Sequence, residues 1–490
     1  MKVCFATSEC VPFVKTGGLA DVSGALPKAL AALGCDVRVF VPLYRSIAVH
    51  DFGFVPAEEL QGVPVRLGER TVSFDAWRGV LPGSAVEVLL IDCPAFFHRS
   101  YPYTNDWDEA DRFIFFQHAV FHALQRLRWA PDVLHCNDWQ TGLMPVFLRE
   151  NYAWDRLFAQ TASVFTLHNI GYQGRFDRSK LPLAGLGERG FYPGGPYELH
   201  GAFCFMKAGL VAADVINTVS PTYAQEVQEA EQGCGLEGVL RSRRGDVYGI
   251  LNGIDLHEWN PSTDPLIPFR YDAGTLAVKE KNKQALLAEM RLPHDPGVPV
   301  IGIVSRFVYQ KGFQLLQPIL QEVMARLPVQ FVVLGSGDAH LEEFFNWAHA
   351  AYPDRVAVYV GYNNRLSHLI EAGSDIFLMP SLYEPCGLNQ MYSLAYGTVP
   401  VVRRTGGLAD TVQDYMETGG RGNGFTFTDV TPYALYQSIA RAVSVFRDRS
   451  AWETIVRRGM AQRFSWDDSA RRYVDLYETA RRRGGYGVAV

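Results

Sequence analysis

The sequence has no long hydrophobic run and no recognisable targeting signal at its start. No stretch reaches the roughly 18 consecutive apolar residues that a membrane span requires, so we expect no membrane partner. The first residues, MKVCFATSEC, pass directly into a strand-like run. They lack the charged segment followed by an apolar segment that marks a secretory signal, and we therefore expect neither a signal peptide nor a transit peptide.

Cysteine pairs with metal-ligand spacing are missing as well. The eight cysteines are scattered along the chain, and none belongs to a C-x-x-C pair. This spacing argues against a zinc site and favours a reducing cytosol. We therefore expect a cytoplasmic protein without a zinc site.

Long runs of basic residues are also missing. The formal net charge is −6, from 46 basic and 52 acidic residues, and the longest basic block is Arg481–Arg483 near the C-terminus. We interpret this block as the solvated end of a helix, where the helix dipole favours cations. The chain therefore lacks the basic footprint of a nucleic-acid-binding protein.

Core-forming residues, by contrast, are plentiful. With 490 residues, 48% of them hydrophobic, the chain exceeds the size at which a single core stops growing, which predicts two domains. Short apolar runs alternate with helical patterns, as is typical of parallel βαβ units. The strand-like runs of the first half are 2–7, 36–42, 86–92, 132–138 and 163–168, and those of the second half are 299–305, 329–337, 355–362, 374–381 and 398–403. Each half is predicted to be a doubly wound α/β sheet.

The predicted domain boundary follows a change in composition. Residues 257–272 are rich in proline and turn formers, and we expect them to form the hinge between a domain of residues 1–256 and one of residues 257–464. The final stretch, 465–490, begins with Ser465-x-x-Asp468 and carries aromatic residues at helical spacing. It is predicted to be a helix that returns to the first domain.

One phrase occurs twice, almost four hundred residues apart: KTGGLADV at 15–22 and RTGGLADTV at 404–412. In both, two glycines follow a strand-like run and precede helix-forming residues, with the first helix continuing through Leu19, Val22 and Leu26. Such a junction exposes unpaired N–H groups and the positive end of a helix dipole, which favours an anion. One copy alone could be a simple tight turn. Two copies, one per domain, predict two loops that meet one anionic ligand.

The second half adds fixed charges next to predicted strand ends. Arg306 and Lys311, in SRFVYQKG, suit a diphosphate because arginine offers a planar fork and lysine a point charge. Glu384 follows a later strand and could either accept sugar hydroxyls or stabilise a helix start. Cys386 is interpreted as a packed thiol, since no His–Asp arrangement lies near it in the sequence.

The first half places polar and aromatic residues together at two predicted strand ends. HCNDWQTG (135–142) and LHNIGYQG (167–174) combine hydrogen-bonding groups with flat aromatic faces. This combination suits a sugar, whose rim is polar and whose ring faces are apolar. Any one of these residues could instead be a satisfied structural polar group.

Taken together, these motifs resemble one family. KTGGLADV, HCNDWQTG, TLHNIGYQG, LNGID, SRFVYQKG, YEPCGLNQMYSLAYG and RTGGLADTV occur here in the order found in bacterial glycogen synthases and plant starch synthases. The resemblance covers nearly the whole chain. It implies a GT-B fold, in which two Rossmann-like domains face a deep cleft and a C-terminal helix returns to the first domain. It also implies transfer of glucose from ADP-glucose to the non-reducing end of an α-1,4-glucan, with retention of configuration and without a metal or other cofactor. From the repeated phrase and the expected hinge, we further predict that the two domains rotate to close on the donor.

The same resemblance implies roles for individual residues. Arg306, Lys311, Glu384, His168 and Asp138 match the catalytic positions, with Glu384 meeting the glucose and the two cations meeting the phosphates. The positions that match donor contacts are Lys15, Gly17, Gly18, Asp21, Asn252, Tyr362, Cys386, Gly387, Leu388, Thr405, Gly406 and Gly407. Tyr392 stands where the wider superfamily often carries a second glutamate that binds ribose, so ribose recognition must differ here.

Three other functions compete with this reading. A nucleotide-dependent oxidoreductase should carry G-x-G-x-x-G after the first strand, and this chain has only G-G after a long loop. A glucan phosphorylase shares the fold but is normally far longer and needs a cofactor lysine that cannot be placed here. A non-catalytic glucan-binding protein is disfavoured by the intact Arg306, Lys311 and Glu384. Residues 96–108, FFHRSYPYTNDWD, could be a glucan platform or part of the core.

Overall fold

The computed structural model describes residues 1–484, which form two compact α/β units. Unit 1 contains residues 1–253 together with the last helix from Trp466, and unit 2 contains residues 254–465. The sequence predicted that the first domain ends at residue 256 and the second at residue 464. Among the described residues, no helix has both the length and the apolar character needed to cross a membrane.

Unit 1 is built on a large, mostly parallel sheet with the strand order β13-β12-β8-β7-β1-β2-β6-β5-β3. The strands from β13 to β6 run parallel, whereas β5 is antiparallel to β6 and also pairs with β4. The bounds are β1 (Lys2–Ala6), β2 (Asp36–Pro42), β3 (Val55–Pro56), β4 (Val63–Leu67), β5 (Arg70–Val80), β6 (Glu87–Asp92), β7 (Val133–Asn137), β8 (Ala162–Leu167), β12 (Val215–Thr218) and β13 (Val247–Gly249). A small separate sheet contains β9 (Arg175–Phe176), β10 (Glu198–Leu199) and β11 (Ala202–Cys204).

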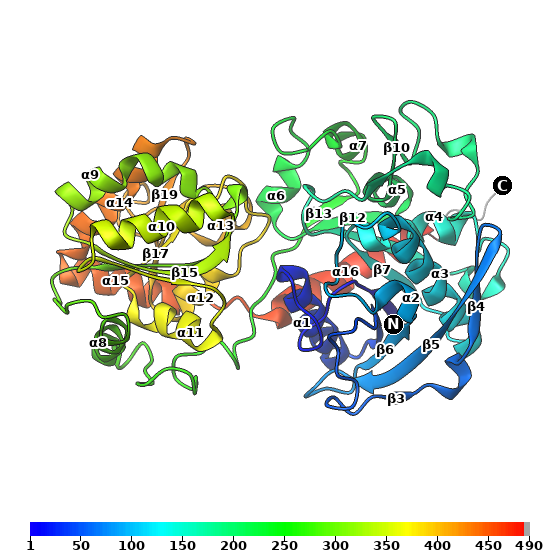
Figure 1. The fold of residues 1–490 in the computed structure, drawn as a ribbon, viewed down its shortest axis with the longest axis horizontal. Helices are drawn as coiled ribbons and strands as arrows, with labels where there is room; N and C mark the ends of the chain where they lie inside the picture. Colours follow the sequence, from blue (N-terminus) through cyan, green and yellow to red (C-terminus); the bar gives the residue numbers. More distant parts are fainter. Residues whose placement is uncertain (485–490) are drawn as a thin grey trace. The chain divides into compact units, whose positions relative to one another are not determined.

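Helices connect these strands and cover the sheet (Figure 1). They are α1 (Gly18–Ala32), α2 (Pro94–Phe97), α3 (Glu109–Leu127), α4 (Met144–Arg149), α5 (Phe205–Ala212), α6 (Pro221–Glu226), α7 (Glu237–Ser242) and α16 (Trp466–Gly484). In α1 the predicted apolar positions Leu19, Val22 and Leu26 are buried, as is Leu30, whereas Leu33 caps the helix and is 42% exposed. Gly34 follows with φ of +88°, a conformation that glycine adopts readily and that ends the helix.

The last helix, α16, packs on unit 1, as predicted. It contacts α1 and β8, and its Trp466, Ala470, Tyr473 and Tyr477 are buried. The Tyr477 hydroxyl lies 2.7 Å from Nδ1 of His135, and Asn217 Nδ2 donates to the Tyr473 hydroxyl. Arg481–Arg483 fall in the last turn of this helix, where cations are favoured.

Unit 2 has a six-stranded parallel sheet in the order β16-β15-β14-β17-β18-β19. The bounds are β14 (Val300–Phe307), β15 (Gln330–Gly337), β16 (Val356–Val360), β17 (Ile376–Met379), β18 (Val399–Arg403) and β19 (Phe425–Phe427). Its helices are α8 (Lys279–Glu289), α9 (Leu320–Arg326), α10 (Ala339–Ala351), α11 (Asn364–Gly373), α12 (Asn389–Ala395), α13 (Gly406–Thr411), α14 (Pro432–Phe446) and α15 (Arg449–Met460).

The two faces of this sheet have separate cores. Alternate residues of β14 point to opposite sides, so Ile301 and Ile303 pack with α9, α10 and α14, whereas Val300 packs with α8 and α11 (Figure 1). Helices on both faces of a parallel sheet are the doubly wound arrangement that the sequence predicts.

The segment expected as a hinge, 257–272, is held firmly on unit 2. The Trp259 ring stacks on the rings of His368 and Tyr392, with centroids 3.9 and 3.8 Å away. The buried carboxylate of Asp264 lies 2.8 Å from His368 Nδ1 and accepts the hydroxyl of Tyr396 at 2.6 Å. The chain therefore passes from one unit to the other at residues 253–254 and 465–466, outside this segment.

Candidate functional site

The strand order of each sheet reverses at one point. In unit 2, β15 and β16 lie on one side of β14 while β17, β18 and β19 lie on the other; in unit 1, β2 and β6 lie on one side of β1 while β7, β8 and β12 lie on the other. In open α/β sheets, ligands bind beyond the carboxyl ends of the strands at such a reversal. Most of the predicted site residues follow the strands at these two points.

The reversal in unit 2 is occupied by an ion pair between two predicted residues. Lys311 Nζ lies 2.6 Å from Glu384 Oε2, and the hydroxyl of Ser381 donates to the same oxygen at 2.8 Å. The side chains are only 18% and 7% exposed. The pair joins the loop after β14 to the loop after β17, which are 73 residues apart in the sequence.

Backbone contacts fix these two loops against each other. The N–H of Leu382 donates to the carbonyl of Gln310 at 2.8 Å. Gly312 has φ of +75°, and a Cβ at this position would lie 1.9 Å from the carbonyl oxygen of Pro380. Only glycine allows this approach, so the position of Lys311 is set by packing of the main chain.

Arg306 lies at the carboxyl end of β14, and Tyr362 follows β16, with β15 between the two strands. Both residues are exposed. The Arg306 side chain makes no hydrogen bond or ion pair with any residue between 1 and 484. Tyr362 follows β16 and is 83% exposed, with its hydroxyl 3.4 Å from Asn364 Oδ1. Their roles toward a ligand remain predictions.

The second TGG phrase is packed against the loop that carries Glu384. A Cβ at Gly406 would lie 1.9 Å from the Glu384 carbonyl oxygen, and one at Gly407 would lie 2.1 Å from that of Cys386. The Gly407 N–H already donates to the carbonyls of Glu384 and Pro385, at 3.1 and 3.2 Å. We predicted these glycines to let a ligand reach the backbone, but here they let one loop of the protein reach another.

The residues from Cys386 to Leu388 form the turn before α12. Cys386 is 5% exposed, which confirms a packed thiol. Gly387 has φ of +71°, and the side chain of Gln390 donates to the carbonyls of Cys386 and Gly387. Helix α12 begins at Asn389, with Leu388 as its N-cap. Thr405, the N-cap of α13, is buried.

The first TGG phrase is open where the second is packed. Apart from the adjacent residues and the backbone of α1 itself, no heavy atom of the described chain lies within 4 Å of a Cβ built on Gly17 or Gly18. Lys15 Nζ pairs with Asp21 Oδ1 at 2.7 Å across the first turn of α1. Burial raises the pKa of Asp21, although Lys15 acts against this shift.

Asp138 and His168 lie together after β7 and β8. Asp138 adopts φ of +56°, rare for a residue other than glycine, and its Oδ1 accepts the N–H of His168 at 2.7 Å. Burial raises the pKa of Asp138 to about 7, against the effect of the backbone hydrogen bonds from His168 and Asn169. Burial lowers the pKa of His168 to about 3, and its Nε2 lies 2.9 Å from Asn137 Oδ1. His168 is therefore neutral at physiological pH.

The raised pKa of Asp138 predicts a specific pH dependence of stability. Between the unfolded value of about 4 and the folded value of about 7, the folded state binds more protons at this carboxyl, so stability falls as pH rises. Asp138→Asn removes the titrating group. The free energy of unfolding of the unchanged protein should therefore decrease relative to that of D138N across this window. Denaturant titrations at several pH values measure this difference, and parallel pH curves for the two proteins would contradict the assignment.

Other predicted residues of unit 1 differ in role. Asn252 is 5% exposed, and its Oδ1 has no hydrogen-bond partner among the described residues. His135, expected near a sugar, is instead fully buried within β7 and bonded to Tyr477 and Thr166. The Trp139 ring packs directly against Gly174 and leaves no room for a Cβ there, so Trp139 also has a structural role. Tyr172, by contrast, is 57% exposed.

Burial bears on two further sequence questions. In the stretch 96–108, Phe96 and Phe97 belong to the core, whereas Trp107 is 78% exposed. Tyr392, which stands in place of a second glutamate, is 8% exposed and stacks on Trp259, so its ring serves to anchor the 257–272 segment.

Sequence reasoning missed Glu9, which follows β1 at the reversal in unit 1. Its carboxylate is 3% exposed and accepts the N–H groups of Thr16 and Gly17. A single acidic residue after a strand has no distinguishing neighbours in the sequence. Its position directly after the first strand, at the edge where ligands bind in such sheets, was the only available signal.

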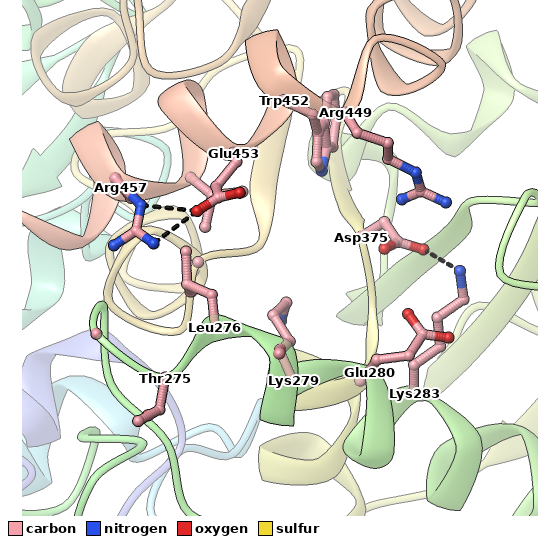
Figure 2. A pocket seen from close by; sticks show the side chains of 15 residues that line it. Thr275, Leu276, Lys279, Glu280, Lys283, Asp375, Arg449, Trp452, Glu453 and Arg457 are labelled. Carbon is pink, nitrogen blue, oxygen red and sulfur yellow. Dashed lines mark hydrogen bonds and ion pairs between the residues drawn. The ribbon is translucent and has the colours of Figure 1, made fainter.

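A cavity of about 420 Å³ lies elsewhere in unit 2, near the amino end of β17 (Figure 2). Two ion pairs lie among its charged side chains: Lys283 pairs with Asp375 at 2.8 Å, and Arg457 pairs with Glu453 at 2.6 Å. None of the predicted site residues lines it. Among residues 1–484, no group of three or more His, Cys, Asp or Glu side chains is arranged to hold a metal ion.

Comparison with known proteins identifies the family. Residues 2–242 match the model of the starch synthase catalytic domain, and residues 288–457 match that of the glycosyl transferases group 1. Relatives include the glycogen synthase of Desulforudis audaxviator, 46% identical over 98% of this chain and 96% of that protein. The glycogen synthase of Anaeromyxobacter dehalogenans is 47% identical over 98% and 99%, respectively.

Solved structures agree with the sequence comparison. The catalytic domain of starch synthase IV from Arabidopsis thaliana, bound to ADP and acarbose, matches with a TM-score of 0.90 and 33% identity, covering 98% of this chain and 99% of that one. A sucrose-phosphate synthase from Thermosynechococcus elongatus, 17% identical with a TM-score of 0.60 and covering 97% and 98%, shares the fold. The chain thus belongs to the glycogen and starch synthase family of glycosyltransferases with the GT-B fold.

Proposed function

We propose that the protein is a glycogen synthase that transfers glucose from ADP-glucose to the non-reducing end of an α-1,4-glucan, with retention of configuration. Family membership supports the reaction class, and the related starch synthase IV bound to ADP and acarbose supports a nucleotide sugar and a glucan as substrates. The observation that carries the proposal is the Lys311–Glu384 pair at the strand-order reversal of unit 2.

The proposed mechanism stabilises the leaving group. ADP leaves readily only when the charge that develops on its diphosphate is met, and one preorganised donor contributes roughly 2–4 kcal/mol at such a point. Arg306, whose side chain has no described partner, and Lys311 are the cations beside the reversal. His168 cannot add a third cation at neutral pH because burial keeps its pKa near 3.

The glucosyl group then reacts as an oxocarbenium-like species, and the acceptor hydroxyl adds on the same face. Either the backbone carbonyl of His168 or the departing phosphate assists this step. Glu384 contacts the glucose, while Asp138 and Asn252 lie near it. The further donor contacts are Lys15, Gly17, Gly18, Asp21, Tyr362, the turn 386–388 and the loop 405–407.

This reaction requires no metal, since side-chain cations serve the diphosphate. Activity should therefore persist in EDTA. A cytoplasmic location remains a prediction, with which the eight free thiols are compatible.

ADP release tests the proposed function most simply. The purified protein should release ADP from ADP-glucose only when glycogen is present, with much slower release from UDP-glucose. Release of ADP without glycogen would contradict a glucan synthase. Formation of glucose 1-phosphate from glycogen and inorganic phosphate would instead indicate a phosphorylase, and equal rates with UDP-glucose would contradict the donor assignment.

A further inference from the structure

Glu9 is a buried carboxylate without a cationic partner. It follows β1, is 3% exposed, and forms no ion pair with any described residue. The nearest candidate cation in the sequence, Lys15, pairs with Asp21 instead. A buried carboxylate is costly unless its oxygens are well hydrogen-bonded, so the donors around Glu9 determine what it does.

Four neutral donors satisfy this carboxylate. Oε2 accepts the N–H groups of Thr16 and Gly17, at 2.5 and 3.0 Å, and Oε1 accepts the hydroxyls of Thr16 and Tyr103, at 2.7 and 2.6 Å. The Tyr103 hydroxyl is also 2.7 Å from Ser8 Oγ. Three of the four donors belong to the first TGG loop, which is otherwise free of packing around Gly17 and Gly18.

The carboxylate therefore occupies the place that a bound anion would take at Thr16 and Gly17. A ligand phosphate cannot use these two N–H groups while Glu9 holds them. The negative charge of Glu9 also contributes to raising the pKa of Asp21 and of Asp138, which places Glu9 within electrostatic range of two predicted site residues.

We propose that Glu9 is a positioning residue, whose carboxylate holds Thr16 and Gly17 so that Lys15 and the start of α1 are presented to the donor substrate. Main-chain packing fixes the second TGG loop, whereas the carboxylate of Glu9, an anion that belongs to the protein itself, fixes the first. This inference rests on the proposed role of the loop 15–18 in donor binding.

Two substitutions separate hydrogen bonding from charge. In Glu9→Gln, the amide oxygen can accept both N–H groups, while the amide nitrogen donates to the hydroxyls, which can reverse their direction. Glu9→Ala removes all four bonds. We expect E9A to raise the KM for ADP-glucose about tenfold or more, because small misplacements of binding groups carry large penalties. E9Q should restore the KM to within about threefold of the original value, and the KM for glycogen should change little in both.

Hydrogen exchange of the peptide spanning residues 15–20 gives a second readout. The amides of Thr16 and Gly17 should exchange faster in E9A and remain protected in E9Q. An unchanged donor KM in folded E9A would overturn the proposal, as would an E9Q variant as impaired as E9A. If E9A fails to fold, Thr16→Val, which removes one donor to Oε1 and keeps the backbone bonds, decides in its place: an unchanged donor KM would overturn the proposal.

Lys15→Ala is the control that separates this inference from the proposed function. If K15A raises the donor KM and E9A does not, the positioning role of Glu9 fails while the loop keeps its role. If K15A also leaves the donor KM unchanged, the role of the loop in donor binding fails, and the proposal for Glu9 fails with it.

Discussion

Lys311→Ala is expected to lower kcat by roughly 10²- to 10³-fold, with little change in the KM for glycogen, because it removes a preorganised donor that meets charge only as the leaving group departs. Steady-state rates of ADP release over a range of glycogen concentrations measure this effect. The exposed Lys281, whose described contact is the Phe269 ring, is the matched control, and K281A should keep kcat within about twofold.

The same substitution also has a structural consequence that must be separated from catalysis. K311A leaves Glu384, only 7% exposed, without its cation, and breaking such a buried pair costs about 3 kcal/mol. The double variant K311A/E384Q removes the unpaired charge and should recover much of this stability. Its kcat should remain low, and recovery of kcat together with stability would contradict a role for Lys311 in leaving-group stabilisation.

Gly407→Ala is expected to destabilise unit 2 by about 3 kcal/mol, since a Cβ there would lie 2.1 Å from the carbonyl oxygen of Cys386 and neither backbone can move freely. For a unit of this size, such a loss lowers Tm by roughly 6–12 °C. Differential scanning calorimetry measures the shift and can resolve separate transitions of the two units.

The matched substitution in the other copy of the phrase is Gly17→Ala. Gly17 has φ of −154°, an extended backbone that any residue can adopt, and apart from the adjacent residues no described atom lies within 4 Å of the added Cβ. Its stability should change by no more than about 0.5 kcal/mol. Equal destabilisation by the two substitutions would show that the two loops do not differ as described.

Much of the fold could be predicted because its strands are buried on both faces and therefore read as continuous apolar runs. The run 2–7 became β1, and the run 329–337 became β15. The short strands β12, β13 and β19 were not predicted, since three or four residues such as VINT or VYG give no periodic signal. The antiparallel β3, β4 and β5 were not predicted either.

The linker shows where composition misleads. Proline and turn residues at 257–272 indicated a flexible hinge, but the apolar Trp259 and the buried Asp264 attach this stretch to unit 2. These contacts, such as the one between Asp264 and His368, join residues more than a hundred positions apart. No local sequence pattern can therefore predict them.

The candidate site was predictable as a set of residue types at strand ends, but their contacts were not. The sequence indicated Lys311 and Glu384 separately, and only the fold pairs them. The two TGG phrases looked equivalent as sequence. In the structure, the glycines of the second phrase are required by packing, while the first phrase binds a carboxylate of its own chain.

A crystal structure with bound ADP would test whether Arg306 and Lys311 stabilise the leaving diphosphate. We predict that the diphosphate binds at the reversal between β14 and β17, with phosphate oxygens within hydrogen-bonding distance of the Arg306 guanidinium and Lys311 Nζ. Phosphates bound away from both cations would contradict it.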